Sequence, residues 1–131
     1  MENNYKFEII SPEKIIFSDN CNMITLPSYE GDMSILKNHI SIIAFLRPGI
    51  IKATKDENNF EEFFVQEGIA EYFNDSLVVL STSIINIKNI SKDFLDNIHR
   101  IANEKLADKN ITDHDRYMLN HKLDVIKEIR V

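Results

Sequence analysis

The side chains best suited to chemistry lie in the segment EGDMSILKNH, residues 30–39. Glu30 and Asp32 could serve as a general base or as metal ligands, and His39 could complete either kind of site. Zinc sites commonly place their ligands at short intervals such as H-x3-H or C-x2-C, and the segment has no such spacing. A hydrolase that uses His39 with Glu30 is therefore the weakest of three functions considered. We expect His39 to make a structural hydrogen bond.

The other reactive residues do not combine into a site. Cys21 is the single cysteine, so no internal disulfide can form, and this favours a reducing compartment. His114 and His121 are seven positions apart in a helical segment, too far for both to bind one ion. Three glycines are too few for a glycine-rich phosphate loop. We expect no catalytic residue, no metal and no cofactor.

The bulk composition excludes several classes of partner. The chain has 131 residues, 44% of them hydrophobic and 27% charged, which suits one domain or a small domain with an appendage. Its formal net charge is −6, without a basic run, so nucleic acid is not an expected partner. No apolar run approaches the ~20 residues of a membrane-spanning helix, and the N-terminus has no signal-peptide pattern. We expect a cytosolic protein, or one peripheral to a cytosolic structure.

The elements that must position these residues begin with short strands. Tyr5, Phe7 and Ile9 alternate with Lys6 and Glu8, which is the period-2 mark of a half-buried strand. Strands are expected at residues 5–9, 15–17, 23–26, 42–46, 50–55, 60–66, 69–73, 77–80 and 84–87. Even spacing of many short strands predicts a sandwich or a flattened barrel.

Turns are expected at residues 18–20, 47–49 and 74–75, where polar residues, proline or glycine interrupt the strands. Within the segment 30–39, Gly31 would permit a bend while Ile35 and Leu36 anchor the chain in the core.

From Ser91 onward the apolar spacing becomes helical, and Ser91 is a good N-cap. Asn110 is expected to end the first helix in a left-handed conformation, and Thr112 to cap the second. The apolar stripe of the second helix runs from Leu119 to Arg130. Helices of this length are marginal alone, so their stripes must dock on each other, on the strands or on a partner. A weakly anchored hairpin of this kind can occupy two positions.

Several segments, taken in order, resemble the epsilon-subunit family of bacterial F-type ATP synthases, the counterpart of the mitochondrial delta subunit. The matching segments are FEIISPEKIIFS (7–18), LPSYEGDMSILKNH (26–39), LRPGII (46–51), FFVQEGIAEY (63–72) and the helical tail. The resemblance implies an α+β fold. An N-terminal antiparallel β-sandwich of about ten short strands (residues 1–87) would precede an antiparallel two-helix hairpin (residues 88–131).

The resemblance also implies a non-catalytic rotor subunit that joins the gamma subunit to the c-ring, peripheral to the cytoplasmic face of the bacterial inner membrane. The loop carrying Glu30, Gly31, Asp32 and His39 would face the c-ring. The hairpin would regulate ATP hydrolysis by meeting acidic segments of the catalytic beta subunits, and the alpha subunits are further candidate contacts. Its candidate contacts are the basic helix residues Lys105, Lys109, Arg116, Lys122 and Lys127. Each of these could equally belong to a solvated helix face.

The sequence departs from the family at a helix motif that binds ATP in some relatives. Leu95 and Asp96 begin the motif, but His99 stands where arginine belongs and Arg100 follows one position later. One position rotates a side chain by about 100° around the helix. We therefore expect weak or no ATP binding by the isolated chain. The alternative to a rotor subunit is a free-standing regulatory module that senses a ligand or nucleotide through its hairpin.

Overall fold

The computed structural model describes residues 3–129 and has ten strands, one 3-10 turn and two helices. The strands are β1 (Tyr5–Ile10), β2 (Ile15–Cys21), β3 (Met23–Ser28), β4 (Gly31–Leu36), β5 (Ile42–Leu46), β6 (Gly49–Asp56), β7 (Asn59–Val65), β8 (Gly68–Phe73), β9 (Ser76–Leu80) and β10 (Ile84–Asn86). The turn η1 (Ile87–Asn89) leads to the helices α1 (Lys92–Leu106) and α2 (Asp113–Glu128). The predicted sequence of strands followed by two helices is confirmed.

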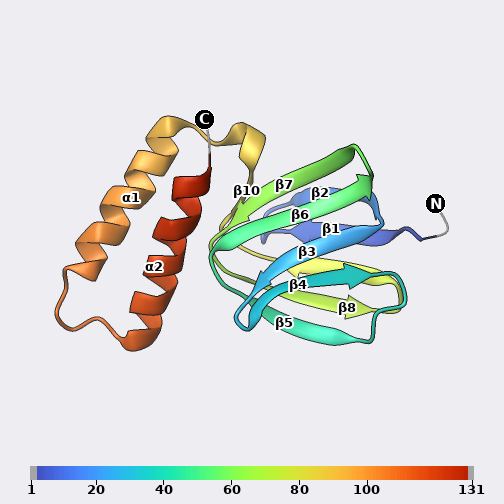
Figure 1. The fold of residues 1–131 in the computed structure, drawn as a ribbon, viewed down its shortest axis with the longest axis horizontal. Helices are drawn as coiled ribbons and strands as arrows, with labels where there is room; N and C mark the ends of the chain where they lie inside the picture. The colour runs from blue at the N-terminus through green and yellow to red at the C-terminus, as the bar shows by residue number, and fades with distance from the viewer. Residues whose placement is uncertain (1–2, 130–131) are drawn as a thin grey trace.

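The strands form one curled sheet in the order β10-β7-β6-β3-β5-β8-β9-β1-β2, with β4 paired to β3 alone. The sheet folds over into two layers (Figure 1). All pairs are antiparallel except one: β1 runs parallel to β9, with Lys6 opposite Ser76. The β8–β9 turn takes positive φ at Asn74 and Asp75, as expected for a tight hairpin turn.

The core lies between the two layers and follows the predicted alternation. Tyr5, Phe7 and Ile9 of β1 face inward beside Phe63, and Tyr72 packs edge-on against Tyr5 at a ring-centroid distance of 5.5 Å. The main core cluster contains no hairpin residue. The sandwich thus encloses a hydrophobic core without help from the helices.

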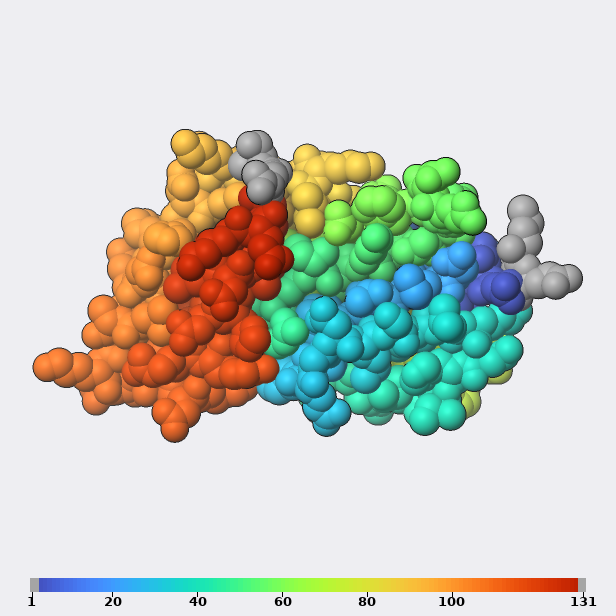
Figure 2. Space-filling model, in the orientation of Figure 1, coloured from blue at the N-terminus to red at the C-terminus, as the bar shows by residue number. Residues whose placement is uncertain are grey.

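The helical hairpin stands beside the sandwich, with α2 between α1 and the strands (Figure 1). It covers an apolar row on the outer face formed by Ile50, Phe64 and Ile85, which are paired across β6, β7 and β10. Ile126 and Ile129 pack on this row, and Phe64 has no exposed surface. Figure 2 shows the hairpin, in orange to red, against one end of the sandwich.

Both predicted helix starts are confirmed. The Ser91 hydroxyl accepts a hydrogen bond from the Phe94 amide, and the Thr112 hydroxyl accepts one from the Asp115 amide. The prediction for Asn110 is wrong: it has no positive φ, and α1 ends at Ala107 in a right-handed conformation. The Asp108 carboxylate accepts the Asn110 amide and stabilises the loop without a left-handed residue.

Two strand-level predictions are also wrong. Residues 18–20 do not turn but continue β2, because β1 supplies partners for each of them and their polar side chains point to solvent. Leu36 does not anchor β4, since it is 55% exposed while Ile35 is fully buried. Neighbouring residues of a strand face opposite sides, so both could not point inward. Arg130, placed on the stripe of the second helix, lies outside the described residues.

Candidate functional site

An apolar row crosses five adjacent strands on the surface of the sandwich. Strand register places Phe45 of β5 beside Ile69 of β8, then Leu80 of β9, Ile10 of β1 and Ile15 of β2. Phe45 and Ile15 are each 58% exposed and Leu80 is 52% exposed. Another row, Ile50, Phe64 and Ile85, is covered by the hairpin, whereas nothing within residues 3–129 covers this one. Contiguous exposed apolar surface of this kind marks a binding site for another protein.

A groove of about 700 Å³ follows the row toward the end of the sandwich nearer the hairpin. Its large apolar lining residues are Ile10, Pro12, Tyr29, Phe45, Leu46, Ile69 and Leu80. Tyr29 is the only lining side chain from the β3–β4 turn. Burial raises the pKa of the Tyr29 hydroxyl, and the Glu67 carboxylate adds to the increase.

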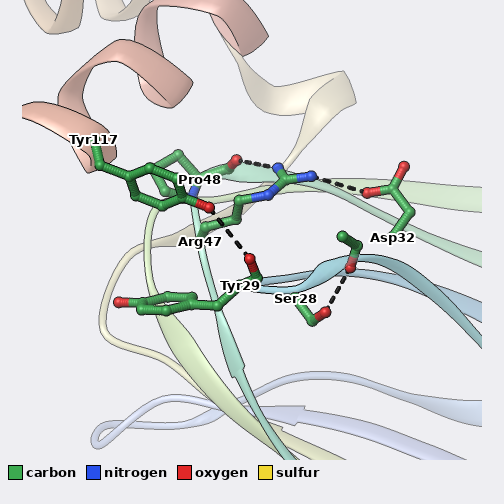
Figure 3. Close-up of polar contacts among 7 residues, drawn as sticks. Ser28, Tyr29, Asp32, Arg47, Pro48 and Tyr117 are labelled. Atoms are coloured by element: carbon green, nitrogen blue, oxygen red, sulfur yellow. Dashed lines mark hydrogen bonds and ion pairs between the residues drawn. The ribbon is translucent and has the colours of Figure 1, made fainter. Parts of the chain in front are cut away.

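Three of the four predicted c-ring contacts lie together: Glu30 in the β3–β4 turn, and Gly31 and Asp32 at the start of β4. Gly31 has a φ of +126°, so it supplies the bend that was predicted, and its carbonyl accepts the Ser28 hydroxyl. Asp32 accepts a 3.2 Å hydrogen bond from the guanidinium of Arg47, which also donates to the Pro48 carbonyl at 3.1 Å (Figure 3). Arg47 is largely buried at its side chain and therefore fixes the position of the more exposed Asp32.

His39 lies at the far end of β4 from the other three predicted contacts. The six residues of β4 lie between Glu30 and the turn before His39, a separation of roughly 15–20 Å. Its ring packs edge-on against Tyr72 at 5.8 Å, and its Nδ1 lies 2.7 Å from the Ile40 carbonyl oxygen. The structure thus does not bring His39 and Glu30 together in one reactive cluster. Within residues 3–129, no group of three or more His, Cys, Asp or Glu side chains is arranged to hold a metal ion.

The five basic hairpin residues differ in how far their side chains are exposed to solvent. Lys105, Lys109, Arg116 and Lys127 are exposed, whereas Lys122 is half-buried. Lys122 and Lys105 line a cavity of about 550 Å³ between the hairpin and the sandwich. Burial lowers the pKa of Lys122, the charge of Lys105 lowers it further, and Glu67 partly opposes both.

Arg100 is held by its own helix. Its guanidinium donates to the Glu104 carboxylate at 3.0 Å and to the Asn97 side chain at 2.8 Å. His99, at the position where the family motif has arginine, lies beside Asn103. No helix in the described part of the chain combines the length and the apolar character needed to cross a bilayer.

Comparison with known proteins identifies the family. The sequence model of the family described as "ATP synthase, Delta/Epsilon chain, beta-sandwich domain" matches residues 4–87, about two thirds of the chain. The chain belongs to the ATP synthase delta/epsilon family.

Relatives in this family match along the whole chain. The "ATP synthase epsilon chain" of Pelagibacter ubique is 41% identical over 130 residues, which cover 98% of this chain and 99% of that protein. The protein of the same name from Parvibaculum lavamentivorans is 32% identical, with coverage of 99% and 98%. The resemblance seen in the sequence is therefore confirmed.

Solved structures show that the fold is shared more widely. A chain of the Euglena gracilis mitochondrial ATP synthase, a structure described as "OSCP/F1/c-ring", aligns with a TM-score of 0.70 at 16% identity, covering 92% of this chain and 76% of that one. A chain of the Tetrahymena thermophila enzyme, described as "central stalk/cring", aligns with a TM-score of 0.61 at 15% identity, covering 94% and 93%.

Sequence reasoning missed the features that connect the parts of this delta/epsilon-family protein. Arg47 was read as part of a turn, and Tyr29 and Tyr117 were given no role. The alternation of exposed apolar residues in 43–45 and 69–73 was a usable signal for the apolar row. The signal was incomplete, because β5, β8, β9, β1 and β2 become neighbours only through the tertiary pairing.

Proposed function

We propose that this chain is the epsilon subunit of an F-type ATP synthase, a non-catalytic part of the central stalk that joins the gamma subunit to the c-ring. The observation that carries the proposal is the uncovered apolar row from Phe45 to Ile15. A sandwich that leaves such a row exposed, while its hairpin covers another apolar row, is built to be covered by a partner. The full-length similarity to ATP synthase epsilon chains supports this function.

The two candidate contact regions suit different partners. The apolar row would dock on gamma, because a long-lived interface needs an apolar centre. The free edge of β4 would face the c-ring, with Glu30, Gly31 and Asp32 at one end and His39 at the other. Both ends of that edge are polar, and Arg47 and Tyr72 hold Asp32 and His39 in place. A polar contact of this kind fits the polar loops of a membrane ring.

Residues 88–131 would act as a regulatory unit attached to the rigid sandwich of residues 1–87. The exposed cations Lys105, Lys109, Arg116 and Lys127 would meet acidic surfaces of the beta subunits, with alpha as a further contact, and Lys122 would join them when the hairpin leaves the sandwich. The complex would place the chain on the cytoplasmic face of the bacterial inner membrane, as a peripheral subunit that does not enter the bilayer.

Substitution within the apolar row tests the proposal. We expect Phe45→Asp and Leu80→Asp to weaken binding to purified gamma by more than about tenfold, because each places a charge at the centre of an apolar interface. Binding is measured by calorimetry, and circular dichroism checks the fold.

Phe60→Asp is the matched control. Phe60 is a 45% exposed aromatic residue on β7, outside the row, so its replacement should leave gamma affinity unchanged. Failure of the unaltered chain to bind gamma at micromolar concentration would overturn the proposal. Equal affinity of all three variants would reject the assignment of the row.

A free-standing ligand-sensing module is the second candidate, and the polar cavity of about 550 Å³ beneath Lys105 and Lys122 is the observation that favours it. ATP is the ligand to test first. Because Arg100 is engaged by Glu104 and Asn97, we expect calorimetry to detect no micromolar ATP binding by the isolated chain. Micromolar affinity would favour the sensing module.

A further inference from the structure

Tyr29 belongs to two surfaces at once. It forms one wall of the groove beside the apolar row, next to Phe45 and Ile69. It also contacts the hairpin, because the Tyr117 hydroxyl of α2 donates to the Tyr29 carbonyl at 3.3 Å. Figure 3 shows the Tyr117 side chain extending from α2 toward the β3–β4 turn. One residue thus connects the helical hairpin to the groove.

The aromatic contacts around Tyr29 extend along α2. The Tyr29 ring lies 6.3 Å from the Tyr117 ring and 5.9 Å from the His114 ring, measured between centroids. His121 packs edge-on against Tyr117 at 4.4 Å. We call Tyr29, Tyr117 and His114 the aromatic latch. Its members are exposed, so each contact is weak and can open without unfolding the sandwich.

The latch holds the part of the hairpin that has least other support. The C-terminal end of α2 is anchored by Ile126 and Ile129 in the apolar cluster around Phe64. Its N-terminal half instead faces the polar cavity that Lys122 lines. Among residues 3–129, the bond from Tyr117 to Tyr29 is the only side-chain hydrogen bond between α2 and the strands or their turns. Together with the buried Leu119, the latch therefore sets the position of this half of α2.

We propose that the latch couples the hairpin to partner binding: the docked hairpin fixes Tyr29 as a wall of the groove, and a partner seated in the groove favours the docked hairpin. This inference rests on the proposed function, since it takes the apolar row as the docking face for gamma. When Tyr29 is already ordered, binding of the partner does not lose the entropy of ordering this side chain, so the affinity is higher. Thermodynamic linkage makes the effect reciprocal, so the hairpin and the partner stabilise each other by the same factor.

Removal of the latch from the α2 side tests the coupling without changing the groove. We expect Tyr117→Ala to accelerate amide hydrogen exchange in α2 and to weaken gamma affinity about fivefold, at the low end of the range for coupled sites. Tyr117→Phe keeps the ring and should produce a smaller loss in both measurements. Asp124→Ala, at an exposed position on the same helix that has no assigned contact, is the control and should change neither.

A second measurement follows the latch directly. The chain has four tyrosines, so fluorotyrosine labelling gives four fluorine resonances, and Tyr117→Phe assigns one of them. Addition of gamma should shift the Tyr29 and Tyr117 resonances together and slow exchange in α2 of the unaltered chain.

The outcomes separate the coupling from the proposed function. Faster α2 exchange in Tyr117→Ala with unchanged gamma affinity would overturn the coupling and leave the proposed function standing. Gamma binding that leaves the Tyr117 fluorine resonance unshifted would also overturn the coupling and leave the proposed function standing. Absence of gamma binding by the unaltered chain would overturn the proposed function and the coupling together.

Discussion

At the scale of single residues, Cys21 illustrates how the sandwich controls reactivity. Its side chain is fully buried, and burial raises the pKa of the thiol to about 11, with the Asp19 carboxylate contributing and Lys55 opposing. A thiol is nucleophilic only as the thiolate. Cys21 in the folded chain is therefore a packing residue, as its position in the core cluster also indicates.

This pKa predicts how stability depends on pH. The folded state holds the Cys21 proton more tightly than the unfolded state, so the free energy of unfolding should fall as pH rises from about 9 to about 11, by on the order of 1 kcal/mol. Tyr5, whose pKa burial also raises, adds to the decline at higher pH.

Urea unfolding at pH 8 and pH 10 measures the change, and Cys21→Ala should reduce it. A thiol reagent should label Cys21 at pH 8 only after urea unfolds the chain. Rapid labelling of the folded chain would contradict the assignment.

The residues of the candidate site were only partly accessible to sequence reasoning. The bend at Gly31 could be predicted because a glycine between polar residues has few other uses. That His39 would lie a strand length from Glu30 could have been inferred once β4 was recognised as a strand. The partners of these residues could not, because Arg47 and Tyr72 reach Asp32 and His39 only through tertiary pairing.

At the scale of elements, the hairpin depends on two capped helices with little core of their own. Of the residues in α1, only Ala102 is fully buried. Each helix start therefore carries an unusual share of the stability of its helix, since the caps satisfy amides that no other group reaches.

Loss of a cap should loosen the hairpin and spare the sandwich. We expect Thr112→Ala to reduce the stability of α2 by about 1 kcal/mol, because the Asp115 amide loses its acceptor. Hydrogen exchange should quicken in the first turns of α2 while β1 and β8 stay protected. Thr112→Ser keeps the hydroxyl and should exchange like the unaltered chain. Equal effects in α2 and in the strands would mean that the two parts unfold together.

The sequence predicted helices and strands well where the spacing of apolar residues determines the element. It predicted them less well where pairing with another strand determines it. The apolar residues alternate with period 2 before residue 90 and follow helical spacing after it, and this change located both the strands and the helices. Residues 18–20 were misread because Ser, Asp and Asn favour turns in isolation. Six ladder positions shared with β1 outweigh that preference in the folded chain. The apolar row required the strand order, which no local pattern encodes.

At the scale of the whole molecule, the main core of the sandwich is separate from the smaller cluster that the hairpin shares with β6, β7 and β10. This gives the division at residues 87 and 88 a testable form. We predict that a chain ending at Ile90 folds as a sandwich and keeps the near-ultraviolet circular dichroism of its core tyrosines, Tyr5 and Tyr72, because the main core cluster contains no helix residue. Phe64, Ile50 and Ile85 would then be exposed, so binding of a hydrophobic dye should increase. Loss of the sandwich signal would contradict this division.

The same shortened chain, assembled into the complete synthase, tests the proposed regulatory unit. If the hairpin restrains the rotor, ATP hydrolysis by the complex should increase when residues beyond Ile90 are removed. Unchanged hydrolysis would mean that the hairpin is a structural appendage.

The single parallel pair, β1 with β9, also sets the timing of folding during synthesis. Strand β1 is made early, yet Lys6 pairs with Ser76. At ~5–20 residues per second, a ribosome needs roughly 4–14 s to add the intervening chain. During that interval β2 is the only one of the two strand partners of β1 that has been made, and the nascent chain presents an unpaired edge and apolar surface to chaperones. The newborn protein is therefore most vulnerable to aggregation just before β9 leaves the ribosome.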